Sequence, residues 1–126
     1  MIKREIYMQR IRPFMNTDLI KVFTGIRRAG KSVMLELVKN ELKEAGINEE
    51  NFLCVNFEQF SNSQYLDVQS LYKKIVDFQK NAKGKIYLFF DEIQEVDGWE
   101  KCVNSCRIDF DCDIYITGSN AKLLSG

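Results

Sequence analysis

The sequence contains no histidine, and this absence limits the chemistry available to these 126 residues. Catalysis by a Ser–His or Cys–His pair is excluded, because the imidazole that would activate the nucleophile is missing. A zinc site of mixed cysteine and histidine ligands is excluded for the same reason. The four cysteines lack the CxxC spacing of a zinc knuckle, and we interpret them as free, mostly buried thiols. They are Cys54, Cys102, Cys106 and Cys112.

Proline and long apolar runs are also scarce. The single proline, Pro13, precedes the first clear apolar run, and no internal repeat or Pro-, Gly- or Ser-rich linker divides the chain. We therefore expect one domain over residues 1–126. No apolar run approaches the roughly 20 residues of a membrane span, and residues 1–5 lack the features of a secretory signal. These observations predict a globular, cytoplasmic protein without a membrane partner.

The chain also lacks net charge, because 18 basic residues balance 18 acidic ones. This balance gives no electrostatic support for a nucleic-acid partner. The charges are unevenly distributed, however. Residues 1–31 hold eight Lys or Arg and two acids, whereas residues 86–113 hold eight acids and two bases. This distribution suits a site for an anion and a divalent cation, and it equally fits solvated charge on separate faces.

From residue 19 onward, short apolar runs alternate with stretches of helical periodicity, which is typical of an α/β fold with a parallel sheet. The expected strands cover residues 19–24, 52–57, 86–90 and 114–117. The expected helices cover residues 31–45 and 67–81. A third expected helix begins near Asp97, which would be its N-terminal cap. Residues 1–18 are expected to form a short helix and a loop. The prediction is a three-layer fold with helices on both faces of the sheet.

Residues 25–32, Gly-Ile-Arg-Arg-Ala-Gly-Lys-Ser, match the phosphate-binding pattern GxxxxGK[ST] of P-loop NTPases. The match lies between an expected strand and an expected helix, where backbone N–H groups and the helix dipole favour phosphate. Gly25 and Gly30 would allow close approach of the phosphates. Lys31 would neutralise the β- and γ-phosphates, and Ser32 would coordinate Mg²⁺. The other expected nucleotide contacts are Ile26, Arg27, Arg28, Ala29 and Val33. For the two arginines, a partner contact or solvation is favoured over a phosphate contact.

Asp91 and Glu92 directly follow the most apolar run, residues 86–90. In parallel sheets of this kind, ligands lie at the carboxyl ends of the strands. Asp91 would therefore hold Mg²⁺ or its waters, and Glu92 would polarise the attacking water. Two solvated acids at a strand end are the alternative. The phosphate-binding pattern in the same chain favours the catalytic interpretation.

Further polar residues follow the other expected strands. Glu58 follows the second strand, and a solvated loop acid is the favoured interpretation for it. Ser119 and Asn120 follow the fourth strand, where they would sense the γ-phosphate or position the water. Thr117 is the other candidate for this role. These residues would complete a site at one edge of the sheet.

Three segments, GIRRAGKS, IYLFFDEIQEVDGWE and IYITGSNAKLLS, resemble prokaryotic AAA+-like ATPases of the additional-strand class that carry a C-terminal domain of unknown function. The resemblance spans nearly the whole chain and implies ATP and Mg²⁺ as ligands. It implies the strand order 5-1-4-3-2. It also implies phosphate binding at Gly25, Gly30, Lys31 and Ser32. It implies metal binding and acid catalysis at Asp91 and Glu92, and a sensor at Ser119 and Asn120.

Only four strands are readable, so the resemblance implies an N-terminal ATPase fragment truncated before the fifth core strand. In such a fragment the first strand would be an unprotected sheet edge. We expect self-association through this edge, or contact with a downstream domain of the parent chain.

The leading hypothesis is Mg²⁺-dependent ATP hydrolysis that drives a conformational change in a longer parent protein. A nucleotide-binding module without significant hydrolysis is the alternative. A P-loop kinase is less favoured, because tandem Asp91-Glu92 suits water activation better than transfer to a bound hydroxyl. A GTPase is less favoured still, since no Asn-Lys-x-Asp stretch occurs.

Overall fold

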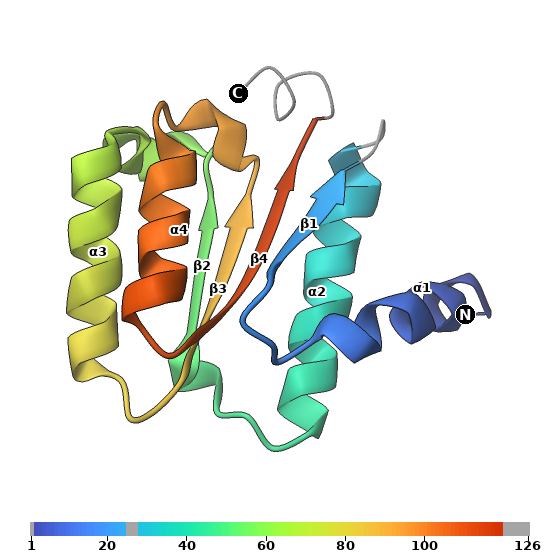
Figure 1. The fold of residues 1–126 in the computed structure, drawn as a ribbon. Coiled ribbons are helices and arrows are strands. Elements are labelled where there is room, and N and C mark those ends of the chain that lie inside the picture. The colour runs from blue at the N-terminus through green and yellow to red at the C-terminus, as the bar shows by residue number, and fades with distance from the viewer. Residues whose placement is uncertain (1, 25–27, 120–126) are drawn as a thin grey trace.

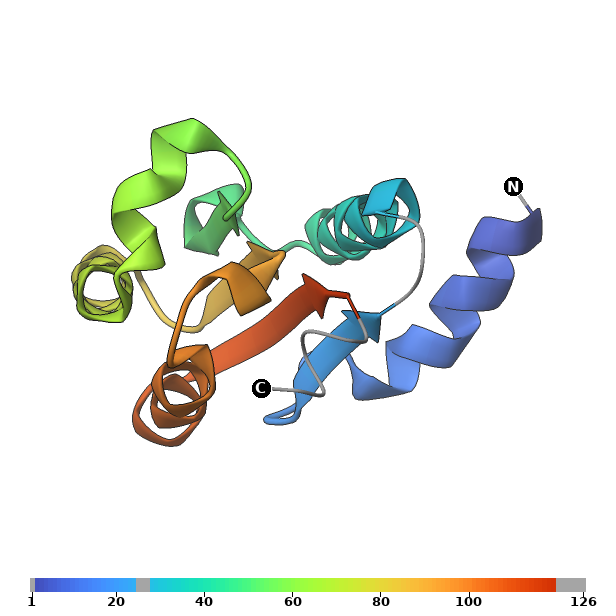
Figure 2. The same cartoon turned by 90° about the horizontal axis from the view of Figure 1, so that it is seen from above.

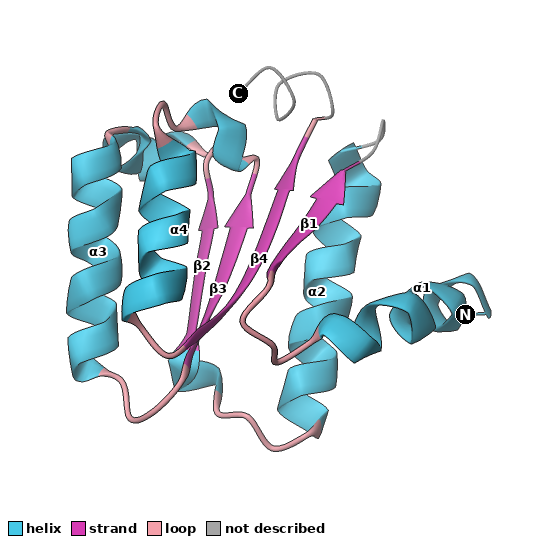
Figure 3. Cartoon of the chain, viewed as in Figure 1, coloured by secondary structure: helices cyan, strands magenta, loops and turns pink. Residues whose placement is uncertain are grey.

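The computed structural model describes the backbone of residues 2–24 and 28–119, and the side chains of residues 5–24 and 30–119. Helices and strands alternate along the chain, which gives an α/β fold (Figures 1 and 3). The strands are β1 (Ile20–Thr24), β2 (Phe52–Asn56), β3 (Ile86–Asp91) and β4 (Cys112–Gly118). The α-helices are α1 (Ile2–Ile11), α2 (Arg28–Glu44), α3 (Val68–Asn81) and α4 (Trp99–Asp109). Short 3₁₀ turns are η1 (Arg12–Phe14), η2 (Glu49–Asn51), η3 (Phe60–Leu66) and η4 (Ile93–Glu95).

The described strands form one parallel sheet in the order β1-β4-β3-β2. This order agrees with the corresponding part of the order that the family resemblance implies. In the register, Ile116 of β4 lies between Val22 of β1 and Phe90 of β3. Because all strands run in the same direction, their carboxyl ends meet at one edge of the sheet, at the top of Figure 1. The ends of β3 and β4 and the start of α2 therefore lie close together.

Helices cover both faces of the sheet, as predicted. Helices α1 and α2 lie over one face, and α3 and α4 lie over the other (Figure 2). Strand β3 is buried along its whole length, and its side chains alternate between two cores. Phe89 belongs to the same core as Val38 of α2, whereas Leu88 belongs to the core that contains Ile75 of α3. Each such burial contributes roughly 1.5–3 kcal/mol. Within the described residues, no helix combines the length and apolar character needed to cross a bilayer.

The end of α2 and both ends of α3 lie within one residue of their predicted positions. Gly46 and Gly84 have φ values of 97° and 87°, and the left-handed conformation that they adopt closes the turns after α2 and α3. Asp67 caps α3, because its carboxylate accepts a hydrogen bond from the Ser70 N–H at 3.1 Å. The short helix expected within residues 1–18 is also present, as α1.

The starts of α2 and β4 differ from the prediction by two residues or more, and the cap of α4 is a different residue. Helix α2 begins at Arg28 instead of residue 31, so it includes the end of the phosphate-binding pattern. Asp97 as the cap of α4 is wrong, because the cap is Gly98, whose φ of 83° favours glycine. Strand β4 begins at Cys112 instead of residue 114. Its second residue, Asp113, is a buried charge, which a sequence pattern assigns to a loop.

Candidate functional site

The candidate site lies at the carboxyl edge of the sheet, where β3, β4 and the start of α2 meet. Asp91 is the last residue of β3, and Glu92 follows it directly. Thr117 is the penultimate residue of the neighbouring strand β4. Lys31 and Ser32 lie near the start of α2, which follows β1. The parallel topology therefore brings Ser32 and Asp91, which are 59 positions apart in sequence, into direct contact.

A chain of hydrogen bonds joins α2, β3 and β4. The Ser32 hydroxyl donates to Asp91 Oδ2 at 2.7 Å, and the Thr117 hydroxyl donates to Asp91 Oδ1. The Thr117 oxygen also accepts a hydrogen bond from the backbone N–H of Glu92 at 2.9 Å. Asp91 and Thr117 are both buried. The Asp91 carboxylate is therefore fixed at both oxygens, because charge-assisted hydrogen bonds of this kind are strong and directional.

Lys31 and Glu92 form an ion pair inside the site. Lys31 Nζ lies 3.1 Å from Glu92 Oε2, and the two side chains are only 6% and 5% exposed. Burial of each charge alone would be costly, so the two groups stabilise each other in this environment. The pair directly links the phosphate-binding pattern with the acidic pair at the end of β3.

The backbone of Glu92 is left-handed, with φ 60° and ψ 50°. This conformation costs a residue other than glycine roughly 1–3 kcal/mol, and it persists only where surrounding contacts enforce it. Here the hydrogen bond to Thr117 fixes the backbone N–H, and the ion pair with Lys31 fixes the side chain. The turn also begins η4, which places Gln94 beside the carboxylate. Gln94 Nε2 donates to Glu92 Oε1 at 2.8 Å.

Ser32 and Asp91 fit a small, hard divalent cation. A hydroxyl and a carboxylate oxygen are ligands that Mg²⁺ accepts, and their 2.7 Å hydrogen bond already places them side by side. Across the residues that the structure describes, no group of three or more His, Cys, Asp or Glu side chains is placed to hold a metal ion. Mg²⁺ commonly completes its shell with water and substrate phosphate.

Other predicted site residues fall elsewhere. Gly25, Ile26, Arg27 and Asn120 lie outside the described residues, and Arg28 and Ala29 are described only as backbone of α2. Gly30 and Val33 are exposed near the start of α2. A Cβ at Gly30 would meet no atom within 4 Å, so the space beside it is open. Ser119 is half-buried just after β4, and Glu58 is exposed in the turn after β2.

Two residues of the site were not clearly predicted. Thr117 was only an alternative to Ser119 and Asn120, although its place at the end of a buried strand was a usable signal. Gln94 was not predicted at all. Its contact with Glu92 depends on the left-handed turn between them, and no glycine in the sequence marks that turn.

A comparison with protein-family models identifies one family for this chain. A family model described as "AAA domain" matches residues 17–126. An uncharacterized protein of Haemophilus influenzae is 48% identical over 126 residues, which are 100% of this chain and 32% of that protein. An uncharacterized protein of Methanocaldococcus jannaschii is 38% identical over 109 residues, which are 84% of this chain and 22% of that protein.

The chain therefore spans 32% and 22% of the lengths of these two relatives. No solved structure matches it significantly. The family match covers most of the chain, and the parallel α/β fold is that of an AAA-type P-loop NTPase domain. The chain thus belongs to the AAA domain family, whose members are ATP-binding, ATPase-like modules.

Proposed function

We propose that residues 1–126 form the ATPase domain of a longer cytoplasmic protein, in which Mg²⁺-dependent ATP hydrolysis drives a conformational change. The contact between Lys31 and Glu92 carries this proposal, because it joins a phosphate-binding residue to an acid at the end of β3. Family membership supports ATP as the nucleotide. We extend the proposal to the additional-strand class and to a C-terminal effector domain, consistent with the greater length of the relatives.

Each residue has a distinct role in this proposal. Backbone N–H groups of residues 25–33 bind the phosphates, and Lys31 exchanges Glu92 for phosphate oxygens when the nucleotide binds. Ser32 and Asp91 hold Mg²⁺, which offsets the charge on the phosphates when it is bound. The exchange frees Glu92 to accept a proton from water. Ser119 and Asn120 follow β4 and are assigned to the γ-phosphate.

Replacing Glu92 by glutamine tests the hydrolysis step. We expect kcat for phosphate release to fall about 100-fold or more, because an amide cannot accept the proton of the water. Nucleotide affinity should be retained, because the glutamine is nearly isosteric and no longer competes electrostatically for Lys31. Phosphate release and titration with a fluorescent ATP analogue measure the two effects. Glu100→Gln on the exposed start of α4 is the matched control.

The same assay separates a second candidate, a nucleotide-binding module without significant hydrolysis. This candidate follows if the buried Lys31–Glu92 pair persists in the nucleotide complex, because Glu92 would then not be freed to accept a proton from water. Nucleotide binding without Glu92-dependent phosphate release would support the module and contradict hydrolysis by this chain. Loss of binding in Glu92→Gln would contradict the assigned role of Glu92.

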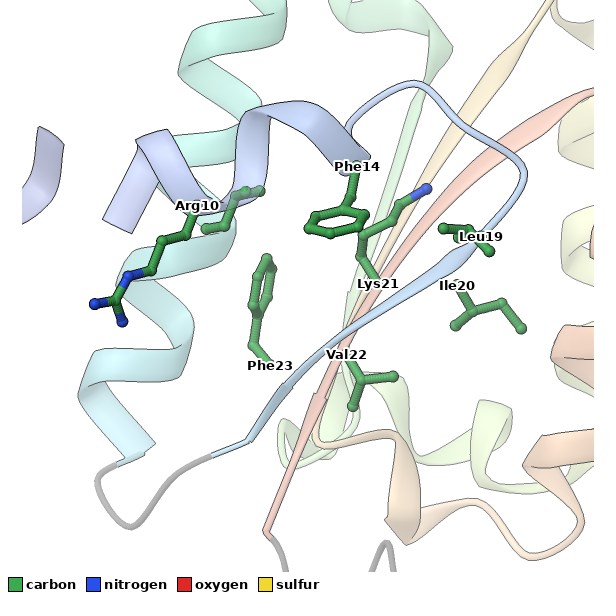
Figure 4. Close-up of a pocket in the computed structure, with 8 residues that line it drawn as sticks. Arg10, Phe14, Leu19, Ile20, Lys21, Val22 and Phe23 are labelled. Carbon is green, nitrogen blue, oxygen red and sulfur yellow. The ribbon is translucent and has the colours of Figure 1, made fainter. Parts of the chain in front are cut away.

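We also propose self-association through β1. This strand is the edge of the described sheet and pairs only with β4 among the described strands. Leu19 and Val22 are 53% and 48% exposed, and Phe14 of η1 lies beside them at 50%. Figure 4 shows Phe14 and Phe23 between η1 and β1, in a groove along this edge. Unpaired edge strands with exposed apolar side chains pair readily with another chain.

Sedimentation velocity over a concentration series tests this proposal. We expect the average mass to rise with concentration, and Val22→Lys to suppress the rise because a charge on an edge strand opposes pairing. Ile108→Lys on α4, which also replaces an exposed apolar residue, should leave the association unchanged. An average mass that stays at the monomer value at all concentrations would contradict self-association. Contact of β1 with a downstream segment would then be the remaining proposal.

A further inference from the structure

Gln94 lies beside Glu92 without a role in the steps described so far. Its Nε2 donates to Glu92 Oε1 at 2.8 Å and approaches Glu95 Oε2 at 3.4 Å. The bond to Glu92 joins residues only two positions apart, which the left-handed backbone of Glu92 makes possible. Gln94 therefore fixes one carboxylate oxygen of Glu92, while Lys31 contacts the other.

The other carboxylate oxygen of Glu92 and the amide oxygen of Gln94 share an unusual property. Among the side chains of residues 5–24 and 30–119, the buried polar atoms without a hydrogen-bond partner are Glu92 Oε2 and Gln94 Oε1. The contact of Glu92 Oε2 with Lys31 is an ion pair without hydrogen-bond geometry. A buried acceptor without a hydrogen bond is destabilising, so such atoms usually face a ligand or a water molecule.

The chemistry of these atoms restricts what they bind. Both are acceptors, and they belong to side chains joined by a hydrogen bond. A water molecule carries two hydrogens and can donate one to each acceptor. In phosphoryl transfer, a side-chain amide can orient the attacking water, so an amide next to the proposed base has a direct chemical use.

We propose that Glu92 and Gln94 together hold the water that attacks the γ-phosphate, with Gln94 as a positioning residue. This inference rests on the proposed ATP hydrolysis. The water oxygen forms a bond to the γ-phosphorus, and the bond from that phosphorus to the β–γ bridging oxygen breaks. The electron pair of the broken bond leaves on ADP, and one water proton passes to Glu92 Oε2. Gln94 Oε1 accepts the other hydrogen of the water, and Gln94 Nε2 holds the Glu92 carboxylate in place.

Gln94→Ala provides the kinetic test. We expect kcat to fall about 10- to 100-fold, because a misplaced nucleophile loses much of the benefit of orientation. KM and nucleotide affinity should stay within about twofold of wild type, and the melting temperature should stay unchanged, since the nucleotide contacts are retained. Gln79→Ala on α3, also half-buried, is the matched control. An unchanged kcat in Gln94→Ala, with the kcat of Glu92→Gln lowered as proposed, would overturn the inference and leave the proposed function intact.

A double variant adds a readout that a structural role would not give. In the Glu92→Gln background, Gln94→Ala should lower kcat no further, because residues that act as a unit show non-additive effects. If kcat of the double variant falls by the product of the two single-variant factors, the shared role of Glu92 and Gln94 is overturned.

A crystal structure with Mg²⁺ and a non-hydrolysable ATP analogue tests the inference without turnover. We expect an ordered water within about 2.6–3.2 Å of both Glu92 Oε2 and Gln94 Oε1. An ordered nucleotide without this water, or with Gln94 turned away, would overturn the inference. A chain that binds no nucleotide would overturn the proposed function as well. A chain that binds nucleotide but releases no phosphate would contradict hydrolysis, and the water position would then decide the role of Gln94.

Discussion

Replacing Lys31 by methionine is expected to weaken nucleotide binding by about 100-fold, which corresponds to about 2.8 kcal/mol. The variant removes a charge-assisted contact with the β- and γ-phosphates, and such contacts contribute about 1.5–3 kcal/mol each. Methionine keeps the length of the aliphatic side chain, so the packing near the start of α2 is largely preserved. Titration of a fluorescent ATP analogue by anisotropy measures the change.

Two further variants make this result specific. Lys39→Met lies on the same helix, and its amine pairs with Glu36 at 2.7 Å, away from the site. We expect Lys39→Met to keep wild-type affinity. Lys31→Met also leaves Glu92 buried without its cation, so the double variant Lys31→Met/Glu92→Gln restores the charge balance. Weak binding in a folded double variant would support the role of Lys31. Near-wild-type binding by Lys31→Met would contradict phosphate binding at this segment.

Much of the fold was predictable from sequence because it follows from burial. The apolar run at residues 86–90 gave a strand buried on both faces, and the charged pair after it marked the end of that strand. The parallel order then placed Asp91 near the start of α2 without any knowledge of side-chain contacts. The hydrogen bond between Ser32 and Asp91 is consistent with this placement.

Other features depend on contacts that no local pattern contains. Glu92 adopts a left-handed backbone, a conformation in which glycine is the usual residue. Neither this turn nor the contact between Glu92 and Gln94 was therefore predictable. Strand β4 starts two residues before its predicted start, because the pattern treated Asp113 as a loop residue. Asp113 is fully buried, since Lys21 on the neighbouring strand neutralises it.

The contacts of Asp113 form a buried polar network at the amino end of the strands, away from the candidate site. Its carboxylate pairs with Lys21 and accepts hydrogen bonds from the Asn16 N–H at 2.9 Å and from the Tyr115 hydroxyl. Lys21 Nζ also donates to the Thr17 carbonyl at 3.0 Å. Burial and the nearby Asp113 carboxylate raise the pKa of Tyr115 above its ordinary value, so the phenol keeps its proton and donates it. The network therefore fastens the segment between α1 and β1 to β4.

Replacing Asp113 by asparagine is expected to lower the free energy of unfolding by about 3–5 kcal/mol, because it leaves the Lys21 ammonium buried without a counterion. For a domain of this size, the melting temperature should fall by about 10–20 °C. Urea denaturation followed by circular dichroism measures the loss. Asp109→Asn, at the exposed end of α4, is the matched control and should change stability by less than about 0.5 kcal/mol.

The double variant Lys21→Met/Asp113→Asn tests the physical cause. If the unpaired ammonium causes the loss, then removing it should recover part of the stability, since apolar replacement of a buried ion pair is often close to neutral. Recovery should be incomplete, because asparagine keeps only some of the hydrogen bonds that Asn16 and Tyr115 donate. The single variants Lys21→Met and Asp113→Asn each give a loss in the free energy of unfolding. If the double variant loses at least the sum of these two losses, the unpaired ammonium is not the cause. Stability would then depend mainly on the hydrogen bonds that hold Asn16 and the turn around it against β4.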